Sequence, residues 1–195
     1  MPATRNDLPT IFFATASAWR DWLAAEHQRT PGVWVKMAKK ATGITSITHP
    51  EALEEALCYG WIDGQRLSFD DTYFLQKFVP RRPRSVWSQI NIGHVQRLID
   101  AGRMQPAGLA EIEKATADGR WDRAYQSQSN AEVPPDLQAA LDADPQAAAF
   151  FATLRGNNKY AVLYRVQDAK KPETRARRIA KFVEMLARGE TVHPQ

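Results

Sequence analysis

The sequence predicts an α+β protein: a small antiparallel sheet with helices in the N-terminal part, followed by an all-helical C-terminal part. Three short segments before residue 80 alternate apolar and polar residues, as half-buried strands do. Beyond residue 135 the apolar residues recur only at helical spacing. Between the two patterns, SQSNAEVPP (127–135) is polar and rich in proline. We therefore expect an α+β domain over 1–125 and a helical domain over 126–195 that docks on it.

The N-terminal part opens with a short helical stripe at 19–23, which ends before a Thr-Pro-Gly turn signal at 30–32. VWVKMA (33–38) then reads as a strand. A helix is expected from Pro50, because proline suits the first helical position, and Gly60 should end it.

Two further strands, WIDGQRLSF (61–69) and TYFLQKFV (72–79), should pair as a hairpin across two aspartates. The stiff connection FVPRRPRSVWSQIN (78–91) follows. Ser85 has a side chain suited to capping the next helix, and Pro106 should open another.

The C-terminal part should contain four helices, over 136–143, 145–154, 158–169 and 172–188. Gly189 is a typical residue to follow the last of them.

Composition favours an ordinary soluble protein. Apolar residues make up 44% and charged residues 25% of the 195, with a net charge of +4. The single cysteine, Cys58, excludes an internal disulfide and lies late in a helix, where we expect a buried structural thiol. No signal peptide or apolar run long enough to span a bilayer is present, so a cytoplasmic location is expected. The four histidines lack ligand spacing, and the common nucleotide and hydrolase motifs are missing, so no metal or cofactor is predicted.

The arginine connection is the main candidate site. Pro80 and Pro83 stiffen the chain around its arginines, whose planar donor forks suit phosphate and carboxylate. The start of the following helix would add a positive dipole end. Alternatively, these arginines pair with nearby acids, lie on a solvated surface, or tie the C-terminal helices to the sheet. The expected ligand-binding residues are Trp61, Asp63, Arg82, Arg84, Trp87, Ser88 and Asn91.

A second basic segment, KKPETRARRIAKF (170–182), opens the last helix. Arg175 and Arg178 lie three residues apart, and Arg177 and Lys181 lie four apart, so each pair is adjacent on a helix surface. Either they form a solvated face or they contact an anion. In the latter case the face would comprise Lys159, Tyr160, Arg175 and Arg178.

Several motifs together resemble one family. EALEEALCYGWIDGQ (51–65), the arginine connection, GRMQPAGLAEIEKA (102–115) and the tail over 133–189 resemble the YdeI/OmpD-associated family of bacteriocin-protection proteins, over roughly Trp19 to Gly189. The resemblance implies an α+β part with an antiparallel sheet, a helical part, and a link to bacteriocin tolerance without an established reaction. It places motif positions at Trp61, Asp63, Gly64, Arg82, Ser85, Trp87, Ser88, Asn91, Lys170, Thr174, Arg175 and Arg178.

Three functional hypotheses follow. The first is a cytoplasmic bacteriocin- or stress-tolerance protein that binds a small phosphate-bearing anion in an arginine-lined cleft. The second is an enzyme acting on such a ligand, with Asp63 as its acid/base. The third is a nucleic-acid-binding protein that uses both basic segments, with affinity that falls steeply with salt. The sequence indicates no membrane insertion and names no protein partner.

Overall fold

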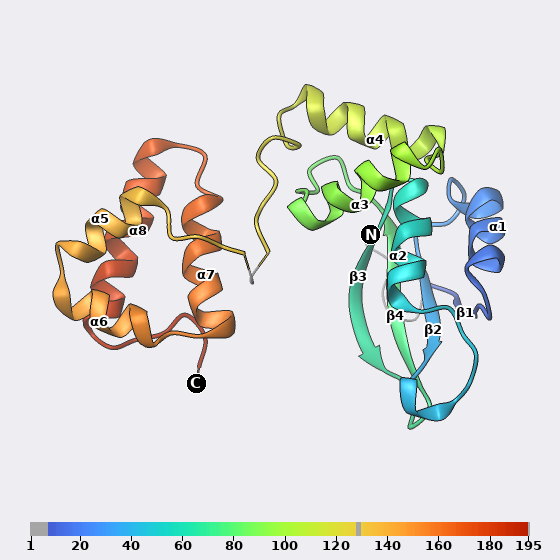
Figure 1. Cartoon of the computed structure of the whole chain (residues 1–195), viewed down its shortest axis with the longest axis horizontal. Helices are drawn as coiled ribbons and strands as arrows, with labels where there is room; N and C mark the ends of the chain where they lie inside the picture. The colour runs from blue at the N-terminus through green and yellow to red at the C-terminus, as the bar shows by residue number, and fades with distance from the viewer. Residues whose placement is uncertain (1–7, 128–129, 195) are drawn as a thin grey trace. The chain divides into compact units, whose positions relative to one another are not determined.

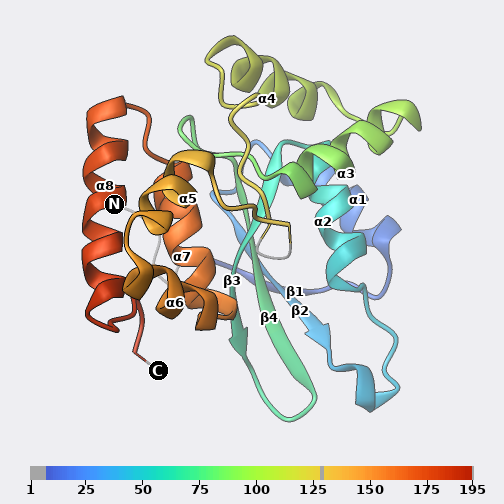
Figure 2. The same ribbon diagram turned by 60° about the vertical axis from the view of Figure 1, so that its left-hand side comes forward.

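The computed structural model describes residues 8–127 and 130–194, and its elements fall into two compact units (Figures 1 and 2). The sheet unit comprises the chain up to Trp87 together with Asn91–Arg123, and the helical unit comprises Ser88–Ile90 together with the chain from Ala124 onward. Residues 128 and 129 of the expected connector lie outside the described residues. The division into domains at 125/126 and their docking stay predictions.

A four-stranded mixed sheet forms the centre of the sheet unit. Its strands are β1 (Thr10–Phe12), β2 (Val33–Ala38), β3 (Trp61–Ser68) and β4 (Tyr73–Pro80), in the order β1-β2-β4-β3. The last three are the predicted strands, and they pair antiparallel as expected. β1 pairs parallel with β2, which makes the sheet mixed rather than purely antiparallel. The α+β class is confirmed.

Two helices pack on one face of this sheet (Figure 1). α1 (Ala16–Glu26) begins after Thr15, whose side chain accepts a hydrogen bond from the Ala18 N–H, and α2 (His49–Cys58) begins with a capping box. The Trp19 ring lies 5.5 Å from that of Phe78 on β4, and its Nε1 donates to the carbonyl of Ala52 on α2 at 3.0 Å. One indole thus joins both helices to the sheet.

A helix begins at the end of the arginine connection, later than predicted. α3 spans Gln89–Asp100 and α4 spans Pro106–Ala117. Ser85 does not cap α3: its N–H donates to the Arg82 carbonyl at 2.9 Å, and its Oγ accepts from the Arg82 N–H at 3.1 Å. The predicted cap is therefore wrong, because the hydroxyl closes a tight turn instead.

The helical unit contains α5 (Pro135–Asp142), α6 (Pro145–Thr153), α7 (Gly156–Gln167) and α8 (Pro172–Ala187), all within two residues of their predicted bounds. Leucine, valine and phenylalanine side chains from all four helices form one buried cluster. The helical periodicity is a reliable signal here because each helix contributes its apolar stripe to that single core. Across the described ranges, no helix has the length and apolar character needed to cross a membrane.

Candidate functional site

The arginine connection forms an exposed turn in which only one arginine is buried. The Arg81 guanidinium carbon lies 3.5 Å from the centre of the Trp87 ring, and its Nη1 donates to the Val86 carbonyl at 3.3 Å. Arg82 and Arg84 are exposed at the turn, and in the part of the chain that the structure describes their side chains contact no acid. Arg81 therefore stabilises the connection, whereas Arg82 and Arg84 are open to a ligand.

The two tryptophans expected to wall the cleft belong to separate aromatic clusters. Trp61 is buried, its ring lies 6.0 Å from that of Trp22, and its Nε1 donates to the His27 carbonyl at 3.2 Å. Trp87 is also buried and lies 5.0 Å from Trp121. In the structure Trp61 is therefore a core residue and not an exposed wall of a cleft.

Asp63 pairs with a histidine that the sequence analysis did not single out. Its Oδ2 lies 3.0 Å from Nε2 of His49, and the two side chains are 30% and 36% exposed. The capping box at the start of α2 fixes the backbone of His49. Fourteen residues separate the two side chains, so no short motif signals the pair. Such a pair orients the imidazole ring and sets which nitrogen holds a proton.

Ser88 and Asn91 lie at the start of α3. Ser88 is buried and forms an isolated parallel bridge with Tyr125, while Asn91 is half-buried. The backbone N–H of Gln89, the first residue of α3, donates to the Tyr125 carbonyl at 3.0 Å. One of the backbone N–H groups at the start of α3 is therefore already occupied by a carbonyl, which leaves fewer donors there for an anion.

Two arginines of the second basic face are used inside the helical unit. Arg175 makes a two-pronged contact with Asp136 at 2.5 and 2.8 Å, and its Nη1 donates to the Val166 carbonyl at 2.9 Å. The hydrogen bonds from Arg175 hold the pKa of the Asp136 carboxyl below its usual value. Arg178 donates to the Arg165 carbonyl and, at 3.3 Å, to Asp168. These arginines tie α8 to α5 and α7.

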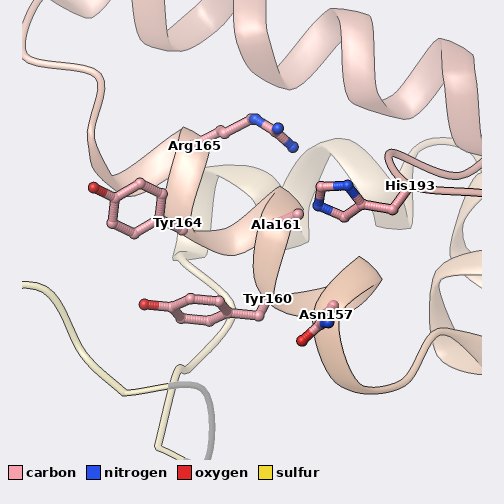
Figure 3. A pocket seen from close by; sticks show the side chains of 6 residues that line it. All are labelled: Asn157, Tyr160, Ala161, Tyr164, Arg165 and His193. Carbon is pink, nitrogen blue, oxygen red and sulfur yellow. The ribbon is translucent and has the colours of Figure 1, made fainter. Parts of the chain in front are cut away.

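A separate candidate site lies on α7, which has a hollow of about 340 Å³ on its surface (Figure 3). Its lining residues on α7 recur at helical spacing, and one residue comes from the C-terminal segment. They are Asn157, Tyr160, Ala161, Tyr164, Arg165 and His193. Figure 3 shows the Arg165 guanidinium reaching toward the side of His193, with both tyrosine rings on the other side of the helix. Of the predicted second face, only Tyr160 lines this hollow.

A pair of hydrogen bonds brings His193 to the hollow. Asn158 accepts from the His193 N–H at 2.8 Å and donates to the His193 carbonyl at 3.2 Å. The Thr191 hydroxyl donates to the same carbonyl at 2.8 Å. The segment after α8 is thus held against the first turn of α7. Because 35 residues separate Asn158 from His193, no local pattern could indicate this contact.

The two tyrosines of the hollow are uncharged, whereas the side chains of Arg165 and His193 are available to a ligand. Tyr160 donates its hydroxyl proton to the Gln126 carbonyl at 3.0 Å, and its ring lies 5.8 Å from that of Tyr164. Burial raises the pKa of both phenols, so they stay protonated at neutral pH. Within the described ranges, neither the Arg165 guanidinium nor the His193 ring has a hydrogen-bond partner. The hollow therefore offers donors to an anion.

Cys58 is unsuited to nucleophilic chemistry. Its thiol is buried, and burial together with the nearby Glu55 charge raises its pKa to about 11. Among the residues that the structure describes, no three His, Cys, Asp or Glu side chains are grouped to hold a metal ion. The expectation that no cofactor is needed stays a prediction.

Residues 11–111 match a family model described as a domain of unknown function, DUF8412. The chain belongs to the DUF8412 family. Beyond this DUF8412 region, residues 130–189 match a second model, OmdA, described as bacteriocin-protection, YdeI or OmpD-associated. The OmdA match confirms the resemblance for the helical unit, although it covers less of the chain than Trp19–Gly189. No curated protein and no solved structure gives a significant match to this DUF8412 protein.

Proposed function

We propose that the hollow on α7 binds a small phosphate-bearing anion. The observation that carries this proposal is the Arg165 guanidinium, which has no partner among the described residues and lies at a hollow shared with His193. Arginine binds phosphate oxygens through two parallel N–H donors. The imidazole of His193 and the side-chain amide of Asn157 supply further donors around the same space.

The start of α7 adds to this attraction. The helix begins at Gly156 without a side-chain cap and has no acidic residue in its first turn. Its first backbone N–H groups and dipole therefore favour an anion near Asn157. No acid is found among the described residues that line the hollow. A phosphate there would meet no like charge within the lining.

The exposed turn of Arg82 and Arg84 is the second candidate place for the same class of ligand. Both side chains are exposed and contact no acid in the described chain, but the expected walls of that site, Trp61 and Trp87, are buried in separate clusters. The α7 hollow is favoured because it combines a concave surface with two donor-bearing side chains, Arg165 and His193, on the same side of α7 (Figure 3).

Binding fits the site better than catalysis does. A general acid or base must lie within hydrogen-bond reach of the reacting group. Asp63 is engaged by His49 at 3.0 Å, and no carboxylate lines the α7 hollow in the described residues. In this proposal the protein acts in the cytoplasm by holding an anionic metabolite during bacteriocin or other stress, in line with the description of the OmdA family.

A thermal-shift screen tests the proposal. Wild type, Arg165→Ala, Arg84→Ala and the exposed control Arg177→Ala are each melted with inorganic phosphate, AMP, ribose 5-phosphate and citrate. A ligand at a hundred times its Kd adds about 2.7 kcal/mol to the free energy of unfolding, a rise in Tm of roughly 5–10 °C. We expect a phosphate compound to shift wild type and Arg177→Ala but not Arg165→Ala. Loss of the shift in Arg84→Ala alone would move the site to the arginine turn, and no shift in any protein would overturn the proposal.

A further inference from the structure

The sheet of the sheet unit has one face that carries aromatic rings and lysines. α1 and α2 lie on the opposite face of the sheet (Figure 2). The Trp19 ring of α1 contacts the Phe78 ring of β4 on that face. Because side chains alternate along a strand and the registers pair Phe12 with Lys36 and Trp34 with Lys77, these four residues share the other face. We call this the aromatic–lysine face; it also includes Tyr73 and the adjoining Phe69.

Lys36 lies among three rings of this face. Its Nζ is 4.5 Å from the centre of the Tyr73 ring, 5.7 Å from that of Phe69 and 5.9 Å from that of Phe12. Phe69 is 50% exposed and Phe12 is 38% exposed, although both are large apolar side chains. Lys36 is thus held where its positive charge adjoins ring surface that water still reaches.

A second lysine repeats this arrangement beside the first. Nζ of Lys77 lies 5.7 Å from the centre of the Trp34 ring. Trp34 itself is buried with Leu8 and Leu75, so it forms the floor of the face rather than an exposed ring. The face therefore has a buried apolar centre, two exposed phenylalanine rings and two lysine ammonium groups close to one another.

The charge of the face is positive. Lys36 and Lys77 are the charged residues at its described strand positions, and no Asp or Glu occurs there. The turn between β3 and β4 carries two acids, Asp70 and Asp71, and Asp70 Oδ1 accepts hydrogen bonds from the N–H groups of Thr72 and Tyr73 at 2.8 and 2.6 Å. At the described strand positions of the face, an anionic partner would therefore meet rings and lysines and no carboxylate.

We propose that the aromatic–lysine face binds single-stranded nucleic acid. Phe69 and Phe12 stack on unpaired bases, and Lys36 and Lys77 contact the intervening phosphates. A duplex fits less well because its bases are already stacked and paired. This site differs from the basic segments considered in the sequence analysis, where Arg175 and Arg178 are held by Asp136, Asp168 and backbone carbonyls.

Fluorescence anisotropy tests this proposal with the full chain. A labelled twelve-nucleotide oligo(dT), the matching oligo(U) and a duplex of the same length are titrated with wild type, Phe69→Ala, Phe69→Trp and Lys77→Gln. Loss of one stacking ring should weaken single-strand binding about 5- to 150-fold in Phe69→Ala, and Phe69→Trp should restore it. Two phosphate contacts predict about a sevenfold loss of affinity between 50 and 200 mM salt, and Lys77→Gln should lower that salt slope.

Two control variants make the result specific. Leu109→Ala removes an exposed apolar side chain on α4, and Lys181→Gln removes a charge on α8; both should bind like wild type. Equal binding of duplex and single strand, or no binding at 50 mM salt, would overturn the proposal. So would a loss of binding in Arg165→Ala with none in Phe69→Ala, because the strand would then occupy the α7 hollow.

Discussion

Asn158 holds the backbone of His193 through two hydrogen bonds, accepting from its N–H at 2.8 Å and donating to its carbonyl at 3.2 Å. This contact places an imidazole from the C-terminal segment beside Arg165 on α7. The donor set of the hollow therefore depends on a residue that does not itself line it. A change at Asn158 can separate the positioning of His193 from the chemistry of Arg165.

Asn158→Ala should weaken the binding of AMP about tenfold, because His193 loses its anchor while Arg165 stays. The free energy of unfolding should fall by only about 1–2 kcal/mol, since both lost hydrogen bonds are on an accessible surface. Isothermal titration calorimetry and urea unfolding measure the two effects. Asn130→Ala, at an exposed position, is the control and should change neither. Unchanged affinity in Asn158→Ala would show that His193 takes no part.

Arg175→Gln should destabilise the protein without altering anion affinity. The variant leaves Asp136 and the Val166 carbonyl without the donors that join α8 to α5 and α7, a loss of about 2 kcal/mol. Urea unfolding should show a lower midpoint, whereas the exposed Arg177→Gln should stay within about 0.5 kcal/mol of wild type. If Arg175→Gln instead abolished AMP binding at full stability, the originally predicted basic face would be the site.

Glu55 should make stability depend on pH in the acid range. Its side chain is only 3% exposed; burial raises its pKa, but hydrogen bonds and charge from Arg20 and Arg103 outweigh burial and lower it overall. A carboxyl whose pKa is lowered by folding stabilises the folded state above its unfolded pKa. That contribution is lost as the pH falls through the lowered folded value.

Glu55→Gln should therefore cost about 2 kcal/mol at pH 7 and progressively less below pH 4.5, the ordinary value for this carboxyl. Urea unfolding of both proteins between pH 7 and pH 3 measures the difference. A gap that stays constant or widens toward low pH would contradict the role given to the Arg20–Glu55–Arg103 contacts.

Two glycines that look alike in sequence should respond in opposite ways to alanine. A Cβ on Gly108 would meet the Cys58 carbonyl oxygen at 2.3 Å, so α4 would have to move away from the end of α2. Gly108→Ala should lose about 1–3 kcal/mol. Gly93, inside α3, has only the tip of Arg97 at 4.0 Å, so Gly93→Ala should gain up to about 1 kcal/mol. Thermal unfolding of both variants measures the sign; a stable Gly108→Ala would contradict the close packing of α4.

Much of the fold follows from local pattern. The four helices of the helical unit appear within two residues of their predicted bounds, because each has an apolar stripe and a proline or glycine at an end. β1 is only three residues long, too short to show a periodicity, and its parallel pairing with β2 depends on a distant partner. Ser85 has the chemistry of a helix cap, but the same hydroxyl closes the Arg82–Ser85 turn, and sequence alone does not choose between them.

The candidate site was less predictable, because its parts come from distant segments. The sequence analysis names Tyr160 as part of a possible anion-contacting face, and in the structure this side chain lines the hollow on α7. Whether an anion binds there stays a prediction. Arg175 and Arg178 look like free surface charges until Asp136 and the Arg165 carbonyl are placed beside them. Arg165 and His193 belong to no motif, and only the Asn158 contact reveals that they share a hollow.

The most direct test of the central claim is calorimetric titration of AMP into wild type, Arg165→Lys and Arg165→Ala. Loss of a charge-assisted contact from the guanidinium should weaken binding by roughly 10- to 150-fold in Arg165→Ala. Arg165→Lys should fall between the two, because lysine keeps the charge but lacks the planar fork of donors. Equal affinity in all three proteins, or no heat of binding in wild type, would contradict the assignment of the α7 hollow as an anion site.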